Sequence, residues 1–373
     1  MIPLIDLQRQ RASIDKDIER AVKRVIEGGQ FILGPETRQF EEEFADYLGV
    51  EHCIGVGNGT DAITLALRAL GIGPGHTVLV PVFTFFATVE AVILCGATPI
   101  FVDVEPHSFN ISINSITATC EKLTDNGTPA NAVIVVDLFG RPCDYSSLEA
   151  LCKAENLRLI ADVAQGIGGE HAGRKLGSYG DIAATSFFPA KPLGCYGDGG
   201  AIMTSNNTLA DKIRSLREHG KGQHKYENVA IGTNSRLDEV QAAVLRAKLP
   251  ILDWEIEQRN KNATNLSERL SQYVQVPTGG DFERDKSAWA QYTITHGKRD
   301  QISEKLAESG IGNAIYYPKP LHLQPAVCHL EYSEGAFPNA EVLAQTVLSI
   351  PVHPYLETNE IETIADAVVE ALE

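Results

Sequence analysis

The chain has 373 residues, 43% of them hydrophobic and 22% charged, which is typical of a soluble globular protein. Its formal net charge of -17 argues against nucleic acid or an anionic membrane surface as a partner, because both are polyanions. The seven cysteines are scattered and form no CxxC pair, so the sequence indicates neither a zinc or other metal site nor a disulfide framework.

The same features predict a protein of the reducing cytoplasm, where unpaired cysteines are usual. The first residues, Met1–Arg9, show no basic region followed by an apolar core, so we expect no secretory signal. No uninterrupted apolar run approaches the length of a membrane-spanning helix, and we expect no membrane partner.

Up to about residue 250, segments of helical period alternate with short apolar runs. Helices are predicted over 14–26, 36–48, 62–70 and 238–249, and strands over 78–80, 100–102, 132–136, 157–161 and 201–204. The apolar runs read as strands buried on both faces, which indicates an α/β fold with a mostly parallel central sheet and helices on both faces. Ligands bind at the carboxyl ends of such strands, so the residues after each strand are the candidates for a site.

From about Asp253 the pattern changes. We expect a charged helix over 254–273, a loop rich in glycine and charge around 279–286, a strand over 292–295, a helix over 301–309, a strand over 313–317 and a terminal helix over 359–372. The sequence therefore predicts a large domain over 1–250 and a smaller C-terminal α/β domain over 251–373.

Lys191 stands in a segment of Phe, Pro, Leu and Gly, whereas a solvated surface lysine usually has charged neighbours. A desolvated lysine loses proton affinity and becomes a nucleophile toward an aldehyde, so a Schiff-base enzyme is the first hypothesis. The alternative is a lysine at a strand end that only extends to water.

Gly59 and Thr60 precede the predicted helix over 62–70, where glycine lets the backbone approach a ligand and the free amides of the helix favour a phosphate or carboxylate. The alternative is that Thr60 or Asp61 simply caps the helix. The segment matches a dinucleotide fingerprint poorly because the third glycine is missing, which disfavours a nucleotide-dependent oxidoreductase.

Two further candidates, Phe85 and Asp162, follow predicted strands, and a third, Ser186, follows the short run Ala183–Thr185. Phe85 could cover a flat ring or be plain core, and Ser186 could donate to a phosphate or be a turn residue. Asp162 could hold a proton on a ligand ring nitrogen, or it could be a helix cap or part of an ion pair, because a buried carboxylate needs a partner.

Two other pairs of polar residues stand near element ends. Asn234 and Arg236 precede a helix and could bind an anion, although surface exposure explains an arginine equally well. Tyr316 and Tyr317 end the predicted strand over 313–317, where they suit a substrate edge or plain packing.

Landmarks that span nearly the whole chain carry a joint resemblance: Gly34-Pro35, Asn58–Ala62, Pro81–Thr88, Asp162–Gln165, Gly177-Ser178, Gly180-Asp181, Ser186-Phe187 with Lys191 and Gly199-Gly200, Asn234–Arg236, and Tyr317-Pro318. The pattern resembles the sugar aminotransferases of the DegT/StrS type, which have fold type I and use pyridoxal 5'-phosphate (PLP). Some members of that superfamily carry histidine at the lysine position and catalyse dehydration, so Lys191 favours transamination.

The resemblance assigns a role to each candidate. Lys191 would form the Schiff base with PLP and then move the proton between substrate carbon and cofactor. Asp162 would pair with the pyridine nitrogen, Phe85 would stack on the ring, and Gln165 would lie near its other side or its hydroxyl. The phosphate ligands would be Gly59, Thr60, Ser186 and, from the second subunit of a homodimer with shared active sites, Asn234.

The amino donor in this family is usually L-glutamate and the acceptor is a nucleotide-linked keto sugar. The segment 186–200 looks most like members that aminate C3 of UDP-2-acetamido-2-deoxy-3-oxo-glucuronic acid for bacterial surface polysaccharide, with Arg236 on the sugar carboxylate. Tyr316 stands where many relatives have His before Tyr-Pro. Another UDP- or dTDP-keto sugar aminated at C3 or C4, or a PLP-binding regulator without turnover, remains an alternative.

Overall fold

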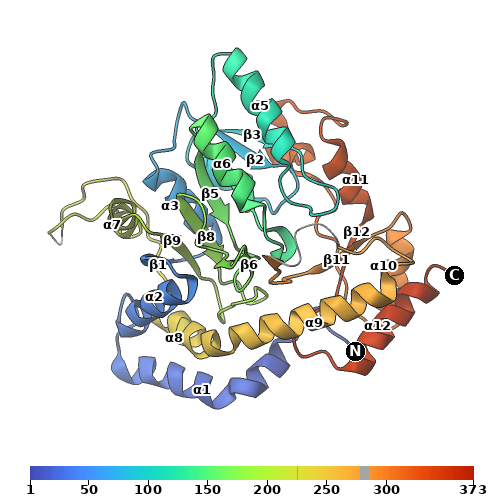
Figure 1. Ribbon diagram of the computed structural model, residues 1–373. Helices are drawn as coiled ribbons and strands as arrows, with labels where there is room; N and C mark the ends of the chain where they lie inside the picture. Colours follow the sequence, from blue (N-terminus) through green and yellow to red (C-terminus); the bar gives the residue numbers. More distant parts are fainter. Residues whose placement is uncertain (225, 278–284) are drawn as a thin grey trace.

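The fold is organised around a seven-stranded sheet with the order β1-β9-β8-β5-β4-β2-β3, seen in the computed structural model of Figure 1. The structure describes residues 1–224, 226–277 and 285–373. The strands are β1 (His52–Val56), β2 (Thr77–Pro81), β3 (Thr98–Val102), β4 (Ala132–Val136), β5 (Arg158–Asp162), β8 (Ile182–Ser186) and β9 (Gly200–Thr204). From β8 to β3 every pairing is parallel, and β9 runs antiparallel to both of its neighbours, so the predicted mostly parallel sheet is confirmed.

The strands alternate their side chains between two hydrophobic cores. Val133 and Val135 of β4 belong to one core, while Ile134 belongs to the other, and all five residues of the strand are buried. Because successive side chains of a strand point to opposite faces, a strand buried on both sides must be apolar throughout. This is why the runs over 78–80 and 132–136 could be predicted as strands.

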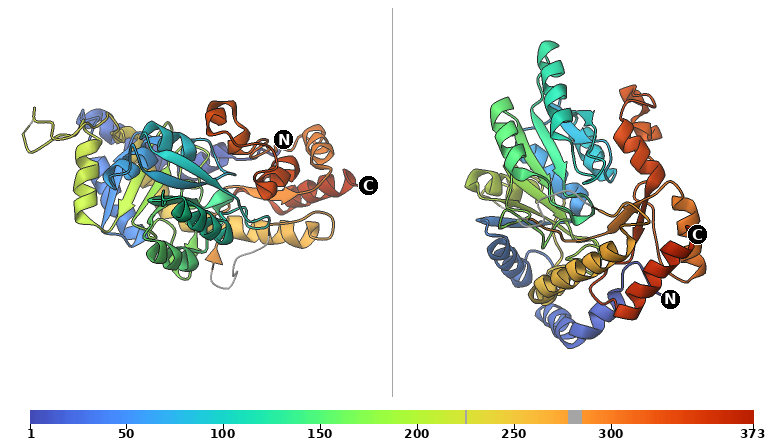
Figure 2. Two further views of the ribbon diagram at one scale, coloured as in Figure 1. Left: turned by 90° about the horizontal axis from the view of Figure 1, so that it is seen from above. Right: turned by 45° about the vertical axis from the view of Figure 1, so that its right-hand side comes forward.

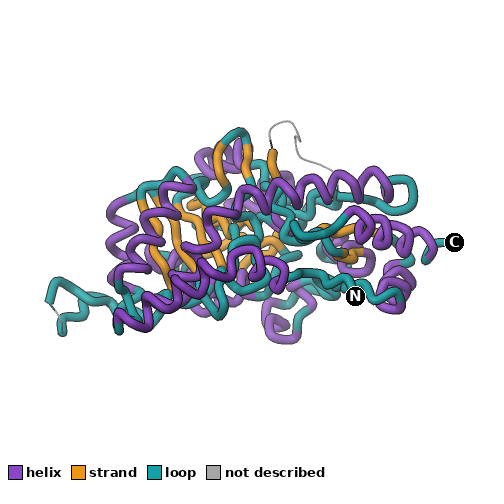
Figure 3. Tube along the Cα trace, turned by 90° about the horizontal axis from the view of Figure 1, so that it is seen from below, coloured by secondary structure: helices purple, strands orange, loops and turns teal. Residues whose placement is uncertain are grey.

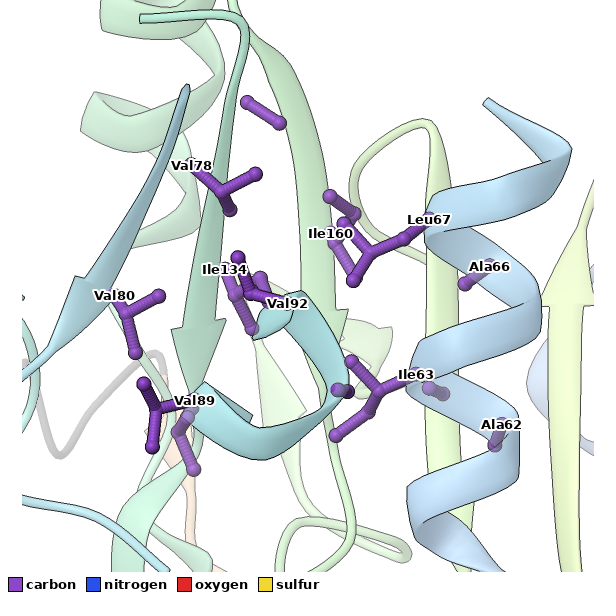
Figure 4. Close-up of a cluster of buried hydrophobic side chains, with 14 of the residues drawn as sticks. Ala62, Ile63, Ala66, Leu67, Val78, Val80, Val89, Val92, Ile134 and Ile160 are labelled. Atoms are coloured by element: carbon purple, nitrogen blue, oxygen red, sulfur yellow. The ribbon is translucent and has the colours of Figure 1, made fainter. Parts of the chain in front are cut away.

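Helices cover both faces of the sheet, as the view from below shows (Figure 3). One face carries α3 (Gly59–Ala69), α4 (Ala87–Leu94) and α7 (Asn207–Leu216). The other carries α2 (Pro35–Leu48), α5 (Ile113–Asp125), α6 (Tyr145–Glu155) and α8 (Glu239–Lys248). In Figure 4, Leu67 of α3 points toward Ile160 of β5, and both belong to the hydrophobic core that packs α3 on this face of the sheet.

The N-terminal helix α1 (Leu7–Gly28) lies against α8, with Ile14 and Ile18 packed on Val244. It begins earlier than the predicted helix over 14–26 because the Asp6 side chain accepts hydrogen bonds from the amides of Gln8 and Arg9 and caps the helix there. The backbone is non-helical at Ile14, which marks a kink where the predicted helix would have begun.

Most of the C-terminal part packs its own hydrophobic core, which also includes Ile2, whereas Leu321, Val327 and Leu343 belong to a core of the large sheet. Its helices are η2 (Leu249–Ile251), α9 (Leu252–Leu270), α10 (Arg299–Glu308), η3 (Leu321–Leu323), η4 (Pro325–Leu330), α11 (Pro338–Thr346) and α12 (Thr358–Glu370). Strands β11 (Tyr292–Thr295) and β12 (Val347–Ile350) pair antiparallel. The domain boundary near residue 250 stays a prediction.

A small sheet joins the two parts of the chain in the order β10-β6-β7. Its strands are β6 (Glu170–His171), β7 (Arg174–Lys175) and β10 (Asp285–Lys286). The predicted loop around 279–286 therefore ends in a strand, and its residues 279–284 lie outside the described part of the chain.

The predicted strand over 313–317 is wrong. Only Ala314 forms a bridge, with Ser349, and Gly312 instead donates its amide to the carbonyl of Ile2 at 2.8 Å. The chain then turns away toward Pro318, which has no amide hydrogen to offer a neighbouring strand. The strand beside β11 is β12, which the sequence did not predict.

No helix in the described part of the chain is both long and apolar enough to span a membrane. The segment between α7 and α8 extends from the body beside α7, at the end away from both chain termini (Figure 2).

Candidate active site

A cavity of about 720 Å³ opens at the carboxyl ends of the parallel strands. Asp162 closes β5 and Ser186 closes β8, and both line the cavity, as does Phe85 from the turn after β2. The position agrees with the rule that open α/β sheets bind ligands at this edge. Nine of the eleven predicted site residues line it: Gly59, Thr60, Phe85, Asp162, Gln165, Ser186, Lys191, Tyr316 and Tyr317.

Lys191 lies in the connection between β8 and β9. Both ends of this connection are anchored, because Ser186 pairs with Gly200 and the amide of Phe187 donates to the carbonyl of Gly199 at 2.8 Å. The ring of Phe187 is fully buried against Phe40 and Phe44. These contacts hold the lysine at the cavity wall, where desolvation lowers its pKa and the Asp162 charge partly opposes that shift.

Asp162 is a buried carboxylate that faces the same cavity. Its Oδ1 accepts the amide of Ala164 at 3.1 Å and its Oδ2 accepts the Thr88 hydroxyl at 3.4 Å. Burial raises the pKa of Asp162, while the amide of Ala164 and the charge of Lys191 act in the opposite direction. A cationic group of a ligand would relieve this desolvation of the carboxylate.

The start of α3 forms a cradle opposite Ser186. Asn58 caps the helix by accepting the amide of Asp61 at 2.8 Å, so the amides of Gly59 and Thr60 begin the helix without intrahelical acceptors. A Cβ at Gly59 would lie 2.7 Å from the Cβ of Ser186, so only glycine allows this close approach. The Ser186 Oγ accepts the amide of Phe188 at 3.2 Å and keeps its own hydrogen to donate. This set of donors suits a phosphate.

Aromatic side chains lie between the strand ends and the C-terminal part. Phe85 is 58% exposed, and its ring centroid lies 6.3 Å from that of Tyr317. The Gln165 amide is held between the amide of Phe139, which donates to its Oε1 at 2.6 Å, and the Tyr317 hydroxyl at 3.4 Å. A flat ligand ring therefore has an exposed phenylalanine face and a fixed amide available.

Comparison with known proteins identifies the family of proteins that has such a cavity. The model of the DegT/DnrJ/EryC1/StrS aminotransferase family matches residues 12–369. The chain belongs to this family.

The aminotransferase is 39% identical over 367 residues to UDP-2-acetamido-2-deoxy-3-oxo-D-glucuronate aminotransferase of Pseudomonas aeruginosa, covering 98% of this chain and 99% of the relative. A crystal structure of a DegT DnrJ EryC1 StrS aminotransferase from Brucella abortus superposes with a TM-score of 0.96 at 46% identity, over 100% of both chains. The S. venezuelae DesV in complex with ketimine intermediate gives a TM-score of 0.95 at 37% identity, over 100% of this chain and 98% of that one.

The predicted fold type I, the PLP dependence and the sugar aminotransferase activity are thereby confirmed. The cavity of the aminotransferase fits this cofactor on its own geometry. A lysine with a lowered pKa, a buried carboxylate with a raised pKa and an amide cradle where only glycine fits meet in one space. These are the needs of an aldehyde, a ring nitrogen and a phosphate, respectively.

Asn234 and Arg236 do not line this cavity in the single chain of the aminotransferase. Asn234 is exposed and forms a bridge with Glu218, while Arg236 is half-buried. The buried Ser235, which stands between them, accepts a hydrogen bond from the amide of Gly57 at 2.9 Å. This bond holds the loop of Asn234 and Arg236 beside the segment that leads into α3.

The candidates from the sequence did not include several polar residues in or next to the cavity, among them Asn58, Thr84 and Thr88. Asn58 begins the segment Asn58–Ala62, and its place directly before a helix is the usual signal of a cap. Thr84 also lines the cavity, and its hydroxyl lies 3.4 Å from that of Thr88. Thr88 stands one helical turn beyond Phe85, and this spacing could have placed it on the same side of the chain.

Proposed function

We propose that this aminotransferase moves the amino group of L-glutamate to C3 of UDP-2-acetamido-2-deoxy-3-oxo-glucuronic acid, for the synthesis of a surface polysaccharide. The observation that carries the proposal is the meeting of Lys191 and Asp162 in one cavity at the strand ends. The similarity to the Pseudomonas aeruginosa enzyme, which acts on this keto sugar by its name, supports the choice of substrate.

When bound, PLP supplies the electron sink for a carbanion at the substrate carbon. The Asp162 carboxylate would hold the proton on the ring nitrogen, because its burial makes an unpaired negative charge costly. The lowered pKa of Lys191 increases the neutral fraction of its Nζ, so this amine can accept the proton from the substrate carbon and return it on the cofactor side.

The remaining residues bind and orient. The amides of Gly59 and Thr60 and the hydroxyl of Ser186 would hold the phosphate, which fixes one end of the cofactor. Phe85 would cover one ring face, and Gln165 would lie near the opposite face or the ring hydroxyl. Tyr316 and Tyr317 would contact the sugar from the C-terminal side of the cavity.

Asn234 and Arg236 would serve the second active site of a homodimer, with Asn234 on the phosphate and Arg236 on the sugar carboxylate. Their exclusion from the cavity of their own chain supports this arrangement. The projecting segment before them also exposes apolar side chains, with Val229 66% and Ile231 85% exposed. Such apolar exposure favours burial against a second copy.

The seven free cysteines support the predicted reducing cytoplasm.

A screen of UDP- and dTDP-linked keto sugars with L-glutamate, read by mass spectrometry, tests the substrate. We expect the mass of a carbonyl-to-amine exchange with the 3-oxo-glucuronic acid, and no product with Lys191→Ala. Faster amination of another keto sugar would replace the proposed substrate. Absence of any glutamate half-reaction in the PLP-loaded protein would favour a regulator without turnover.

Mixing two inactive variants tests the shared site. Lys191→Ala and Asn234→Ala should each be weakly active or inactive alone, and a mixed dimer should regain activity because one of its two sites holds both native residues. If mixing after subunit exchange restores nothing, Asn234 does not act across a dimer.

A further inference from the structure

A second cavity, of about 560 Å³, lies beside α5 and α6 and holds a serine, a histidine and an aspartate in a line. Ser146, His171 and Asp285 all line it. Among the residues that the structure describes, it shares no lining residue with the cavity of Lys191. The transaminase chemistry therefore gives these three side chains no role.

The three side chains form a continuous hydrogen-bonded chain. The His171 Nδ1 lies 2.7 Å from the Asp285 Oδ1, and the His171 Nε2 lies 3.0 Å from the Ser146 Oγ. A carboxylate can only accept, so Nδ1 carries the hydrogen, and the Nε2 of the neutral ring then accepts from the serine hydroxyl. This is the order of contacts by which a histidine acts as a base toward a serine and is held in the required tautomer by an acid.

The backbone fixes these positions. Asp285 and His171 are paired partners in the ladder of β10 and β6, which sets their two side chains side by side. The ring of His171 packs edge-on against the rings of Tyr145 and Tyr179. Tyr145 is the residue before Ser146 in α6, so the same packing holds the histidine next to the serine.

Of the three side chains, the serine is the accessible one, as a nucleophile requires. Ser146 is exposed at the cavity, His171 is only 8% exposed, and the side chain of Asp285 is 12% exposed. A substrate can therefore reach the hydroxyl, while the base and the acid behind it are largely shielded from water.

The first turn of α6 also offers a donor for a developing negative charge. The amide of Tyr145 donates to the carbonyl of Cys143 and that of Ser147 to the Asp144 Oδ1. The amide of Ser146 lies between them in the first turn, where no intrahelical acceptor exists. In chymotrypsin-like serine proteases, the amide of the nucleophile itself is one of the oxyanion donors.

We propose that Ser146, His171 and Asp285 form a second catalytic site that hydrolyses a carboxylic ester. The Ser146 Oγ attacks the ester carbonyl carbon, its proton passes to the His171 Nε2, and the carbonyl oxygen takes the negative charge. As the ester C–O bond breaks, the proton passes to the leaving alcohol. Water then attacks the acyl-serine with His171 as base, which releases the carboxylic acid and restores the hydroxyl.

The lining of the cavity selects the class of ester. Ile111, Ile113 and Leu148 provide apolar surface for a short acyl chain. Glu105 and Asp144 place negative charge at the same cavity and disfavour an anionic ester. The substrate is therefore a neutral or cationic ester with a short aliphatic acyl group.

An alkyl fluorophosphonate probe and p-nitrophenyl acetate test the site in the PLP-loaded, full-length protein. We expect phosphonylation at Ser146, located by peptide mass spectrometry, and ester hydrolysis that Ser146→Ala abolishes. Asp285→Asn should slow both reactions about 100-fold or more, because an aspartate that orients the base contributes at least this much. Lys191→Ala should leave both rates unchanged, since it lies in the other cavity.

Ser147→Ala is the matched control, because this serine is the next residue of the same turn but its hydroxyl donates to the Asp144 Oδ2 at 2.6 Å. It should retain labelling at Ser146, and all variants except Lys191→Ala should retain the glutamate half-reaction as proof of folding. Labelling elsewhere, no labelling, or equal loss of both reactions in Ser147→Ala would overturn the proposal and leave the three residues as a structural link between β10 and α6.

Discussion

The change Asp162→Asn separates two effects of this buried carboxylate: its negative charge favours the reaction with bound cofactor, but the same charge is costly to bury in the protein without cofactor. The amide has the shape of the carboxylate, so an oxygen can still accept the amide of Ala164, now 3.1 Å away. The negative charge that would pair with the ring nitrogen of PLP disappears. Breaking a buried, hydrogen-bonded charge pair from one side costs about 3–5 kcal/mol. We therefore expect the half-reaction with L-glutamate to slow by about 10² to 10⁴-fold.

The protein without cofactor should respond differently. Burial raises the pKa of Asp162, which means that the charged form is the disfavoured one in the folded state. Replacing it by a neutral amide should change the free energy of unfolding by no more than about 1 kcal/mol, the usual scale of one altered hydrogen bond.

Asp137 provides a matched control at the next strand. This carboxylate is fully buried after β4, accepts the amide of Cys143 and the hydroxyl of Tyr145 at 2.9 Å each, and has its pKa raised by burial to about 7. An amide has one accepting oxygen and cannot keep both of these 2.9 Å bonds, so Asp137→Asn should lower stability. Because Asp137 does not line the cavity, the half-reaction should stay within tenfold. Urea unfolding of the apoprotein and the visible absorbance of the cofactor measure the two quantities. A folded, loaded Asp162→Asn enzyme with a half-reaction within tenfold of wild type would refute the assigned role.

Three other changes have defined outcomes. Gly59→Ala should weaken PLP binding at least about tenfold in a fluorescence titration, because its Cβ would lie 2.7 Å from the Ser186 Cβ; undiminished affinity would mean that the start of α3 can shift. Tyr316→Phe should raise the KM for the keto sugar and leave the glutamate half-reaction unchanged, and the opposite pattern would remove Tyr316 from the sugar site. His353 is 1% exposed, and burial and the charge of Arg259 lower its pKa to about 4, so its ring is neutral in the folded protein. The stability that depends on this neutral ring is complete above pH 6.5 and is lost as the pH falls toward 4. Between pH 8 and pH 5 the wild type should lose about 2 kcal/mol of stability relative to His353→Leu, and parallel urea-midpoint profiles would contradict this.

The sequence predicted well those elements in which every residue has the same surroundings, so that one uniform pattern of residue types marks the whole element. Ala132–Val136 is buried on both faces, and its uniform apolar pattern predicts a strand with the bounds of β4. In β8, by contrast, Ala183 and Ala184 have weak strand propensity, and only their neighbours in the sheet determine their conformation. Strand β12 follows α11 directly, with no glycine or proline to mark the change.

The candidate site divides in the same way. Asp162 could be predicted because the end of a predicted parallel strand is a defined place, and the structure puts it at one cavity with Ser186. Tyr316 and Tyr317 also reach the cavity, although the strand that was expected to carry them does not exist. Asn234 and Arg236 could be assigned only through a family resemblance, since no pattern within one chain says that a residue acts in another.

The two ends of the chain are tied into the same region (Figure 1). Ile2 exchanges backbone hydrogen bonds with Gly310 and Gly312 at 2.9 and 2.8 Å, and the guanidinium of Arg9 binds the Glu360 carboxylate at 2.8 and 2.7 Å. The first helix therefore cannot complete its contacts until α12 has been synthesised. A truncated chain that lacks α12 would leave α1 without its Arg9–Glu360 contact, so completion of the fold waits for the synthesis of α12.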